Sequence, residues 1–181
     1  MDVHVLVPLK AIDPKSRLAD VLAPGERADL MRSLLERVVG VVQEAGIDRV
    51  TVVTGEPIEG YDTWLDQGLP WNDALSGAMQ EVRTPLAAVI SADLPLLRSE
   101  EIEALLAATP ARGIAIGRAL DGGTNAVAMR PPGLVQTHFG EPQSCAVHAG
   151  LGVPHVVVDL PGLAFDVDTP ADLAKMHAAC R

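Results

Sequence analysis

A short apolar run that stops at a lone carboxylate constrains the fold of this chain more than any other feature. Residues 86–90 contain only Leu, Ala, Val and Ile, a composition typical of a buried strand. Pro95 cannot continue a central strand, so Asp93 is expected just beyond the strand's carboxyl end. Ligands bind at that edge in open α/β sheets. Asp is also frequent in turns, so Asp93 alone leaves an ordinary turn as the alternative.

The amino-terminal part of the chain predicts a strand–helix–strand unit. Residues 3–7 are rich in Val and end at a proline, as a first strand would. Apolar residues recur at helical spacing over 26–44, Gly46 then ends the helix, and 50–53 form a second strand. Strands joined by such a crossover are parallel. With the later segments, this predicts an α/β fold in one domain over 1–181.

The remaining segments alternate between expected helices and strands. Asn72 or Asp73 is expected to cap a helix over 72–83, and Ser99 to cap a helix over 100–108. An Asp-Gly-Gly sequence predicts a hairpin between two later strands. Further strands are expected over 113–117, 124–129 and 155–159, an extended piece over 165–168, and helices over 144–149 and 170–179.

The charge of the chain restricts its partners. Asp and Glu outnumber Lys and Arg by 24 to 14, giving a net charge of −10, which argues against a nucleic-acid partner. An anionic small ligand still fits if basic residues cluster locally or a metal ion neutralises the charge. The chain has no apolar run of membrane-spanning length, no secretory signal and only two cysteines, so we expect a cytoplasmic protein without a membrane partner.

Three basic residues follow the first strand. Lys10, Lys15 and Arg17 fall within one short segment and could form a phosphate cradle, with Arg as a fork and Lys as a point charge. The alternative is an ordinary solvated basic loop. Neither GxGxxG nor GxxxxGK[ST] occurs, which argues against a standard dinucleotide-binding fold and a P-loop enzyme.

A pair of carboxylates precedes the last expected helix, which Thr169 is expected to cap. In an extended segment Asp166 and Asp168 point to the same side, where they repel each other unless a cation lies between them. The alternative is two exposed acids at a helix start. Together with Asp93 they supply three hard oxygen donors. Mg²⁺ is usually held by one or two carboxylates plus substrate phosphates, so this set fits Mg²⁺ with a nucleoside triphosphate.

Several motifs occur in an order that resembles one family. They are Val-Pro-Leu-Lys, Lys-Ser-Arg-Leu, Asn-Asp-Ala, Ala-Asp-Leu-Pro, Gly-Gly-Thr-Asn-Ala, Phe-Gly with a following Ser, and Asp-Val-Asp-Thr-Pro. The chain is similar over nearly its whole length to the CofC/FbiD guanylyltransferases of coenzyme F(420) biosynthesis, which are themselves similar to the molybdenum-cofactor guanylyltransferases. The resemblance implies a doubly wound, mixed, mostly parallel sheet with helices on both faces, like that of the nucleotide-diphospho-sugar transferases.

The same resemblance implies an activity and a set of site residues. GMP would pass from GTP to a small phosphorylated carboxylic acid (phosphoenolpyruvate, 2-phospho-L-lactate or 3-phosphoglycerate), with release of diphosphate. The implied metal ligands, for Mg²⁺, are Asp93, Asp166 and Asp168, and the implied catalytic residues are Asp93, Lys10, Lys15 and Arg17, the three basic residues contacting phosphates. The implied substrate-binding residues are Thr124, Gly140 and Ser144 at the acceptor's carboxylate, with Asn72 and Gly123.

Other interpretations stay open on the residues alone. A molybdenum-cofactor or sugar nucleotidyltransferase would usually carry a Gly-rich loop after the first strand, and this chain has no such loop there. A glycosyltransferase could use Asp166 and Asp168 as a metal-binding pair, although such a pair usually lies mid-chain. A non-catalytic nucleotide-binding module is the alternative from another class. The residues do not distinguish among the acids, or guanine from adenine, and a homodimer is the default oligomeric state.

Overall fold

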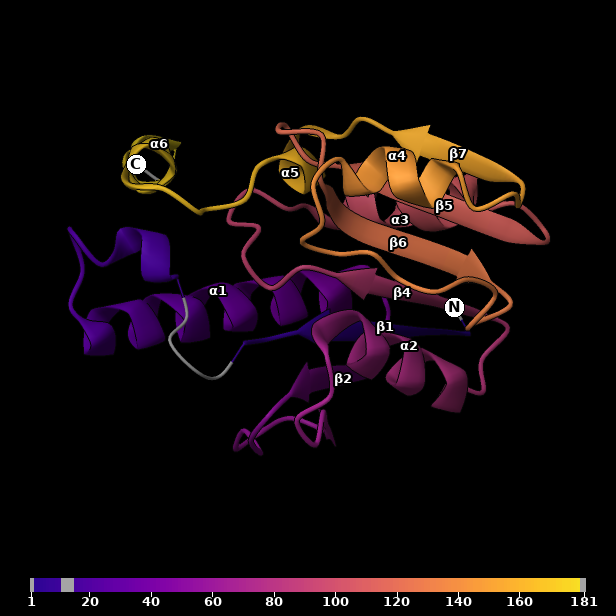
Figure 1. The fold of residues 1–181 in the computed structure, drawn as a ribbon, viewed down its shortest axis with the longest axis horizontal. Coiled ribbons are helices and arrows are strands. Elements are labelled where there is room, and N and C mark those ends of the chain that lie inside the picture. The colour runs from indigo at the N-terminus through magenta and orange to yellow at the C-terminus, as the bar shows by residue number, and fades with distance from the viewer. Residues whose placement is uncertain (1, 11–14, 180–181) are drawn as a thin grey trace.

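The fold is built on a mixed sheet of seven strands (Figure 1). The computed structural model describes residues 2–10 and 15–179, so residues 11–14 of the basic loop lie outside the described part. The strands are β1 (Val3–Pro8), β2 (Arg49–Thr54), β3 (Thr63–Leu65), β4 (Leu86–Ile90), β5 (Gly113–Arg118), β6 (Thr124–Arg130) and β7 (His155–Val158).

Six of these strands run in one direction and one runs against them. The sheet order is β3-β2-β1-β4-β6-β5-β7. Strand β6 is antiparallel to both β4 and β5, whereas every other pair of neighbours is parallel. The expectation of a mixed, mostly parallel sheet is confirmed. The reversed strand has a consequence for the site, because β6 begins at the edge of the sheet where β4 ends.

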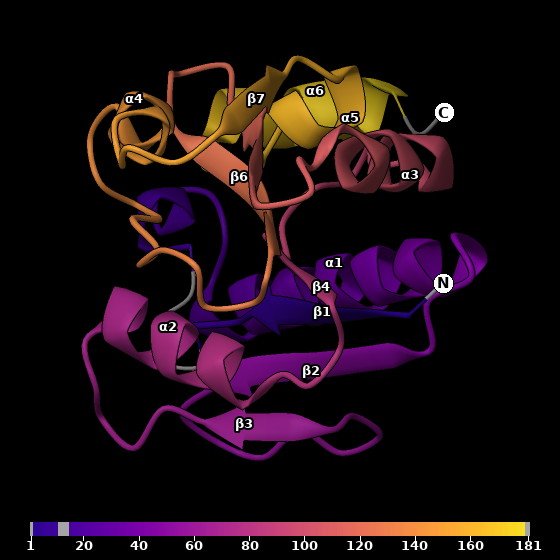
Figure 2. The same cartoon turned by 90° about the vertical axis from the view of Figure 1, so that its right-hand side faces the viewer.

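Helices cover both faces of the sheet (Figure 2). They are α1 (Pro24–Glu44), α2 (Trp71–Glu81), α3 (Ser99–Ala108), α4 (Ser144–Ala149), α5 (Pro161–Ala164) and α6 (Pro170–Ala179), with a 3₁₀ turn at Ser16–Leu18. Helices α1 and α3 pack on one face, and α2 and α4 pack on the other. None of the helices in the described part of the chain has the length and apolarity needed to cross a membrane.

Strand β4 lies between two apolar cores, which explains why it is apolar at every position. All five of its residues are buried. Leu86, Ala88 and Ile90 pack on the side of α1 and α3, while Ala87 and Val89 pack on the side of α2 and α4. Alternate residues of a strand point to opposite faces, so a strand with helices on both sides needs a continuous apolar run.

Two predicted helix caps are wrong. Helix α2 begins at Trp71 with Pro70 at the cap position, so neither Asn72 nor Asp73 caps it. Helix α3 includes Ser99, and Arg98 takes the cap position instead. The Asn72 side chain instead binds the backbone of Phe139, far along the chain. At α3 the Glu101 carboxylate makes a local hydrogen bond to the N–H of Arg98 and a long-range one to the N–H of Gly162.

Other local predictions are confirmed. Strands β5 and β6 form the expected antiparallel hairpin. Thr169 caps α6: its hydroxyl accepts the Asp172 N–H at 3.3 Å, and the Asp172 carboxylate accepts the Thr169 N–H at 3.0 Å. Helix α5 was not expected, because a single turn of four residues is too short to show helical periodicity.

The start of β5 requires a residue without a side chain. A Cβ atom built on Gly113 would overlap the carbonyl oxygen of Pro154 and would lie 3.0 Å from Cβ of Pro110. The same carbonyl accepts the N–H of Ile114 at 3.0 Å, so it cannot move away without disturbing the link between β5 and the segment before β7.

The substitution Gly113→Ala is therefore expected to lower the free energy of unfolding by about 1–3 kcal/mol, the usual range for an overpacked site. Gly40→Ala is the matched control, because Gly40 lies inside α1 and a Cβ there meets nothing within 4 Å. That control should raise stability by up to about 1 kcal/mol through helix propensity. Urea unfolding of both variants measures the difference, and equal stabilities would contradict the assignment of Gly113.

Candidate active site

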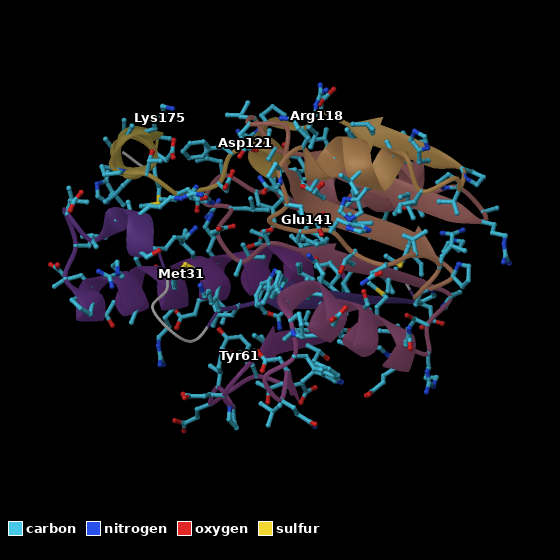
Figure 3. All side chains as sticks on the ribbon, viewed as in Figure 1. Met31, Tyr61, Arg118, Asp121, Glu141 and Lys175 are labelled. Carbon is cyan, nitrogen blue, oxygen red and sulfur yellow. The ribbon has the colours of Figure 1, made fainter. Side chains whose placement is uncertain are left out.

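A cavity of about 600 Å³ opens at the edge of the sheet where β1 and β4 end. Three of its lining residues are labelled in Figure 3 and come from distant parts of the chain: Met31 from α1, Asp121 from the turn between β5 and β6, and Glu141 from the loop before α4. The predicted site residues that line it are Lys10, Lys15, Arg17, Asp93, Gly123, Thr124, Gly140, Ser144, Asp166 and Asp168. Asn72 is the one predicted residue outside the lining.

The direction of β6 brings the second half of the chain to this edge. Ala126 of β6 lies opposite Ile90 of β4, and the N–H of Ser91 donates to the carbonyl of Asn125 at 2.8 Å. Because the two strands are antiparallel, the first residues of β6 lie beside the last residues of β4. Thr124 therefore lines the same cavity as Asp93.

The segment before α6 supplies two more carboxylates to the cavity. The N–H of Val167 donates to the carbonyl of Asp93 at 3.2 Å, which fixes this segment beside the end of β4. Val167 and Phe165 are buried in a small apolar cluster with Leu18. Asp166 and Asp168 alternate with them and line the cavity.

The predicted clustering of three carboxylates is confirmed. Asp93, Asp166 and Asp168, here called the acidic triad, each place a carboxylate oxygen so that the three oxygens lie within 4.8 Å of one another. One triad oxygen, Oδ1 of Asp93, is buried and accepts no hydrogen bond within the described part of the chain. A buried carboxylate oxygen with no donor is costly, so this atom is a candidate ligand for a cation.

Lys15 already lies between two members of the acidic triad. Its Nζ is 2.5 Å from Oδ2 of Asp93 and 2.7 Å from Oδ1 of Asp168, and Arg17 contacts Oδ2 of Asp168 at 3.2 Å. Burial acts to lower the pKa of Lys15, but the charges of Asp93 and Asp168 outweigh it and the pKa is raised. Lys15 therefore stays protonated and offsets the charge of the triad.

Ionisation of Asp166 is disfavoured in the folded protein. Burial, and next the charge of Asp93, raise the pKa of Asp166 from 3.8 to about 6. The side-chain amide of Asn125 donates to Oδ1 of Asp166 at 3.2 Å and partly offsets this. The triad is thus a site that gains from an additional positive charge.

The cavity also carries two hydroxyl groups. Thr124 and Ser144, here called the hydroxyl pair, come from the start of β6 and the start of α4. Oγ of Ser144 donates to Oγ1 of Thr124 at 3.1 Å, and both residues are buried. Their side chains thus lie together on the cavity wall, although they are far apart along the chain.

Asn72 does not line the cavity but binds the loop that does. Its amide nitrogen donates to the carbonyl of Phe139 at 3.1 Å, and its amide oxygen accepts the Phe139 N–H at 2.7 Å. Gly140 follows directly in a left-handed conformation, with φ of 75°, which favours glycine. The contacts of Asn72 thus connect α2 to the loop that places Gly140 at the cavity.

The two glycines of the hairpin turn use their amides locally. The N–H of Gly123 donates to Oδ1 of Asp121 at 2.8 Å, and the N–H of Gly122 donates to the carbonyl of Ala119 at 3.1 Å. Gly123 still lines the cavity. Lys10 also lines it and is exposed.

Sequence reasoning assigned no role to two residues that organise the site. Asn125 lines the cavity and its amide also donates to the carbonyl of Leu163 at 2.9 Å, so it links β6 to both α5 and Asp166. A buried amide in an otherwise apolar strand could have signalled this role. His148 is fully buried and hydrogen-bonded to Ser144 and Thr124.

Known proteins resemble this chain across nearly all of its length. The family model for CofC-like guanylyl transferases matches residues 3–178. A phosphoenolpyruvate guanylyltransferase of Sphaerobacter thermophilus is 37% identical and aligns with 97% of this chain and 93% of its own. A 2-phospho-L-lactate guanylyltransferase of Haloarcula marismortui is 35% identical, with 96% of this chain and 84% of its own covered.

The fold has relatives among solved structures. A structure from Desulfovibrio desulfuricans G20, provisionally assigned as a nucleotide-diphospho-sugar transferase, superposes with a TM-score of 0.79 at 17% identity. The match covers 99% of this chain and 88% of that one. The fold class expected from the sequence is therefore confirmed. Because the family model spans almost the whole chain and the two guanylyltransferases share more than 30% identity with it, this chain belongs to the CofC-like guanylyl transferase family.

Proposed function

We propose that this member of the family transfers GMP from GTP, with Mg²⁺, to a small acid that carries both a phosphate and a carboxylate, and releases diphosphate. The observation that carries the proposal is the arrangement of one cavity: the acidic triad, with Lys15 and Arg17 beside it, and the hydroxyl pair both line it. A site for two anionic substrates needs charge neutralisation for the phosphates and donors for the carboxylate.

The acidic triad fits a divalent metal ion. Its three carboxylate oxygens are close enough to share one ion, and the unpartnered Oδ1 of Asp93 is an available ligand. All the donors are oxygen atoms, which suits Mg²⁺, an ion held in proteins by carboxylates together with substrate phosphates. A bound Mg²⁺ would supply Lewis-acid polarisation of the nucleotide phosphates.

The protein's own task in the reaction is positioning and charge neutralisation. A phosphate oxygen of the acceptor acid attacks the α-phosphorus of GTP; the new P–O bond forms as the bond to the bridging oxygen of diphosphate breaks. The attacking phosphate is ionised near neutral pH, so no general base is required. Lys10, Lys15 and Arg17 would hold phosphates by charge, since all three line the cavity.

The hydroxyl pair would recognise the acceptor's carboxylate. Thr124 and Ser144 line the cavity together with Gly140. Because the Ser144 hydroxyl donates to Oγ1 of Thr124, the hydroxyl proton that a carboxylate would accept is that of Thr124. The two related enzymes from S. thermophilus and H. marismortui are named for phosphoenolpyruvate and 2-phospho-L-lactate. Both acids have a carboxylate close to a phosphate, so either one satisfies the same set of groups in this chain.

The direct test is diphosphate release by the purified protein with GTP and Mg²⁺. Phosphoenolpyruvate, 2-phospho-L-lactate and 3-phosphoglycerate are offered separately, and we expect release with at least one of the first two. Replacing GTP by ATP in parallel tests the base preference. No release with any acid, in protein shown to be folded by circular dichroism, would contradict the proposed function.

Asp93→Asn should abolish turnover, with a loss of at least about 100-fold, because it removes a charged ligand and leaves the side chain's size unchanged. Asp48→Asn is the matched control, since Asp48 is exposed and outside the cavity lining. The control should keep the wild-type rate. Rates of diphosphate release and their dependence on Mg²⁺ concentration measure the effect, and a wild-type rate in the Asp93 variant would refute the metal assignment.

Asp166→Asn should stabilise the metal-free protein above pH 6. In the folded protein the Asp166 pKa is raised from 3.8 to about 6, so its ionisation costs stability above pH 6 and costs nothing below pH 3.8. The variant should gain about 1 kcal/mol at pH 7.5, and this gain should disappear near pH 4. Urea unfolding at both pH values tests it; Mg²⁺ should then stabilise the wild type more than the variant. A variant less stable than the wild type at pH 7.5 would show that burial and the charge of Asp93 do not disfavour ionised Asp166.

A further inference from the structure

A buried histidine lies directly behind the hydroxyl pair. His148 comes from α4, which packs beside β5 and β7 (Figure 1), and its side chain has no exposed surface. It does not line the cavity. The chemistry proposed above makes no use of this residue, yet both of its ring nitrogens are hydrogen-bonded.

The contact at Nε2 fixes which nitrogen carries the proton. The backbone N–H of His138 donates to Nε2 of His148 at 3.0 Å. A backbone N–H can only donate, so Nε2 must be an unprotonated acceptor. A neutral imidazole carries one proton, which is therefore on Nδ1.

The contacts at Nδ1 agree with this tautomer. Nδ1 lies 2.8 Å from the carbonyl oxygen of Ser144, a group that can only accept. It also lies 3.1 Å from Oγ1 of Thr124. A proton on Nδ1 satisfies the carbonyl and is shared with the threonine oxygen, whereas a lone pair there would face the carbonyl oxygen.

These contacts determine what the Thr124 hydroxyl can do. Its oxygen accepts from Oγ of Ser144 at 3.1 Å and faces the protonated Nδ1 of His148 at 3.1 Å, so both of its lone pairs are engaged. Its own proton has no acceptor within the described part of the chain. Since Thr124 lines the cavity, the remaining direction for this proton is toward a ligand.

We propose that His148 is a positioning residue that holds the Thr124 hydroxyl as an obligate donor toward the carboxylate of the acceptor acid. This inference rests on the proposed function and deepens it. A free threonine hydroxyl can rotate to donate or to accept, and so tolerates many partners. A hydroxyl with both lone pairs occupied can only donate, which matches a carboxylate, because an ionised carboxylate only accepts.

The surroundings of His148 keep it in this state near neutral pH. Burial lowers its pKa from 6.5 to about 4, and the groups that face it from the preceding loop are the His138 ring, Glu141 and the Phe139 ring. The rings of His138 and Phe139 lie 5.6 and 5.7 Å from its own in edge-on contact. The imidazole therefore stays neutral and keeps its acceptor nitrogen.

The tautomer can be measured without any turnover. Long-range ¹H–¹⁵N correlation spectra of the wild-type protein, assigned by loss of the signals in a His148→Gln variant, report which ring nitrogen carries the proton. We expect the Nδ1–H form at pH 7.5. An Nε2–H form, or a doubly protonated ring, would overturn the proposal.

Two amide variants test the contacts at Nδ1 and Nε2 of His148 separately. In His148→Asn the amide nitrogen reaches the position of Nδ1 and keeps the donor, but the acceptor for His138 is lost. In His148→Gln the amide oxygen reaches the position of Nε2 and keeps that acceptor, but the donor near Thr124 is lost. His155→Gln on β7 is the control, because His155 is exposed and outside the cavity lining.

The expected result is a difference between the two substrates. His148→Gln should raise KM for phosphoenolpyruvate, or for whichever acid the wild type uses, by about two- to tenfold, the range expected when the neutral hydrogen bond that orients the Thr124 hydroxyl is lost. Its KM for GTP should change by less than about twofold, within the effect of an ordinary distant substitution. His148→Asn and the His155 control should keep the acid's KM near the wild-type value.

Other patterns contradict the proposal. An unchanged KM for the acid in His148→Gln, or an equal rise in KM for both substrates, would indicate a purely structural role. Thermal unfolding of each variant identifies a loss of folding, and the tautomer measurement then decides alone. If the wild type turns over no acid, the proposed function fails. A measured Nδ1–H tautomer would still support the hydrogen bonds described between His148 and its partners His138, Ser144 and Thr124. Calorimetric binding of phosphoenolpyruvate to the wild type and to His148→Gln would then test the donor directly, with equal affinities contradicting it.

Discussion

Repulsion among three carboxylates is the constraint on which the cavity depends. Asp93, Asp166 and Asp168 hold oxygens within 4.8 Å of one another in a half-buried site, and like charges at that distance separate unless the structure prevents it. Two features hold them: the hydrogen bond from Val167 to the Asp93 carbonyl, and the ammonium group of Lys15 between two of the side chains. Stability is given up here for an arrangement that suits a cation, as is common at functional sites.

One reversed strand connects this acidic group to the rest of the cavity. In an all-parallel sheet, the residues that begin a strand lie at the opposite edge from those that end its neighbour. Because β6 is antiparallel to β4, Thr124 begins where β4 ends, and α4 then adds Ser144 beside Thr124. The acidic triad and the hydroxyl pair therefore line one cavity of about 600 Å³.

The sequence alone predicted the parts of the fold that depend on local pattern. The apolar run of β4, the hairpin at Asp-Gly-Gly and the cap at Thr169 are determined by neighbouring residues, and all three are present. The cap at Asn72 was wrong because its side chain binds the backbone of Phe139, far away in the sequence. The partner of Asn72 has no signature near the start of α2, so local pattern could not reveal it. The cap at Ser99 was wrong by one residue, because α3 begins at Ser99 with Arg98 at the cap position.

The site was likewise predicted only where local pattern determines it. Strand ends and the two-residue period were enough to bring Asp93, Asp166 and Asp168 together. The position of Lys15 between them, and the network around His148, depend on side-chain packing between distant segments. A lone histidine in a short helix is usually a packing residue. The partners of His148, Thr124 and His138, can be identified only from the three-dimensional structure of β6 and the loop before α4.

The contact between His138 and His148 also bears on how such a site can change over evolutionary time. The group that fixes the imidazole is the main-chain N–H of residue 138, which every amino acid except proline possesses. The side chain at 138 does not supply this hydrogen bond, although its ring packs edge-on against the imidazole, whereas no other side chain reproduces both ring nitrogens of residue 148. A substitution at 138 that keeps the backbone path of this loop would therefore preserve the hydrogen bond to Nε2, whereas a substitution at 148 would remove at least one of the two ring-nitrogen contacts.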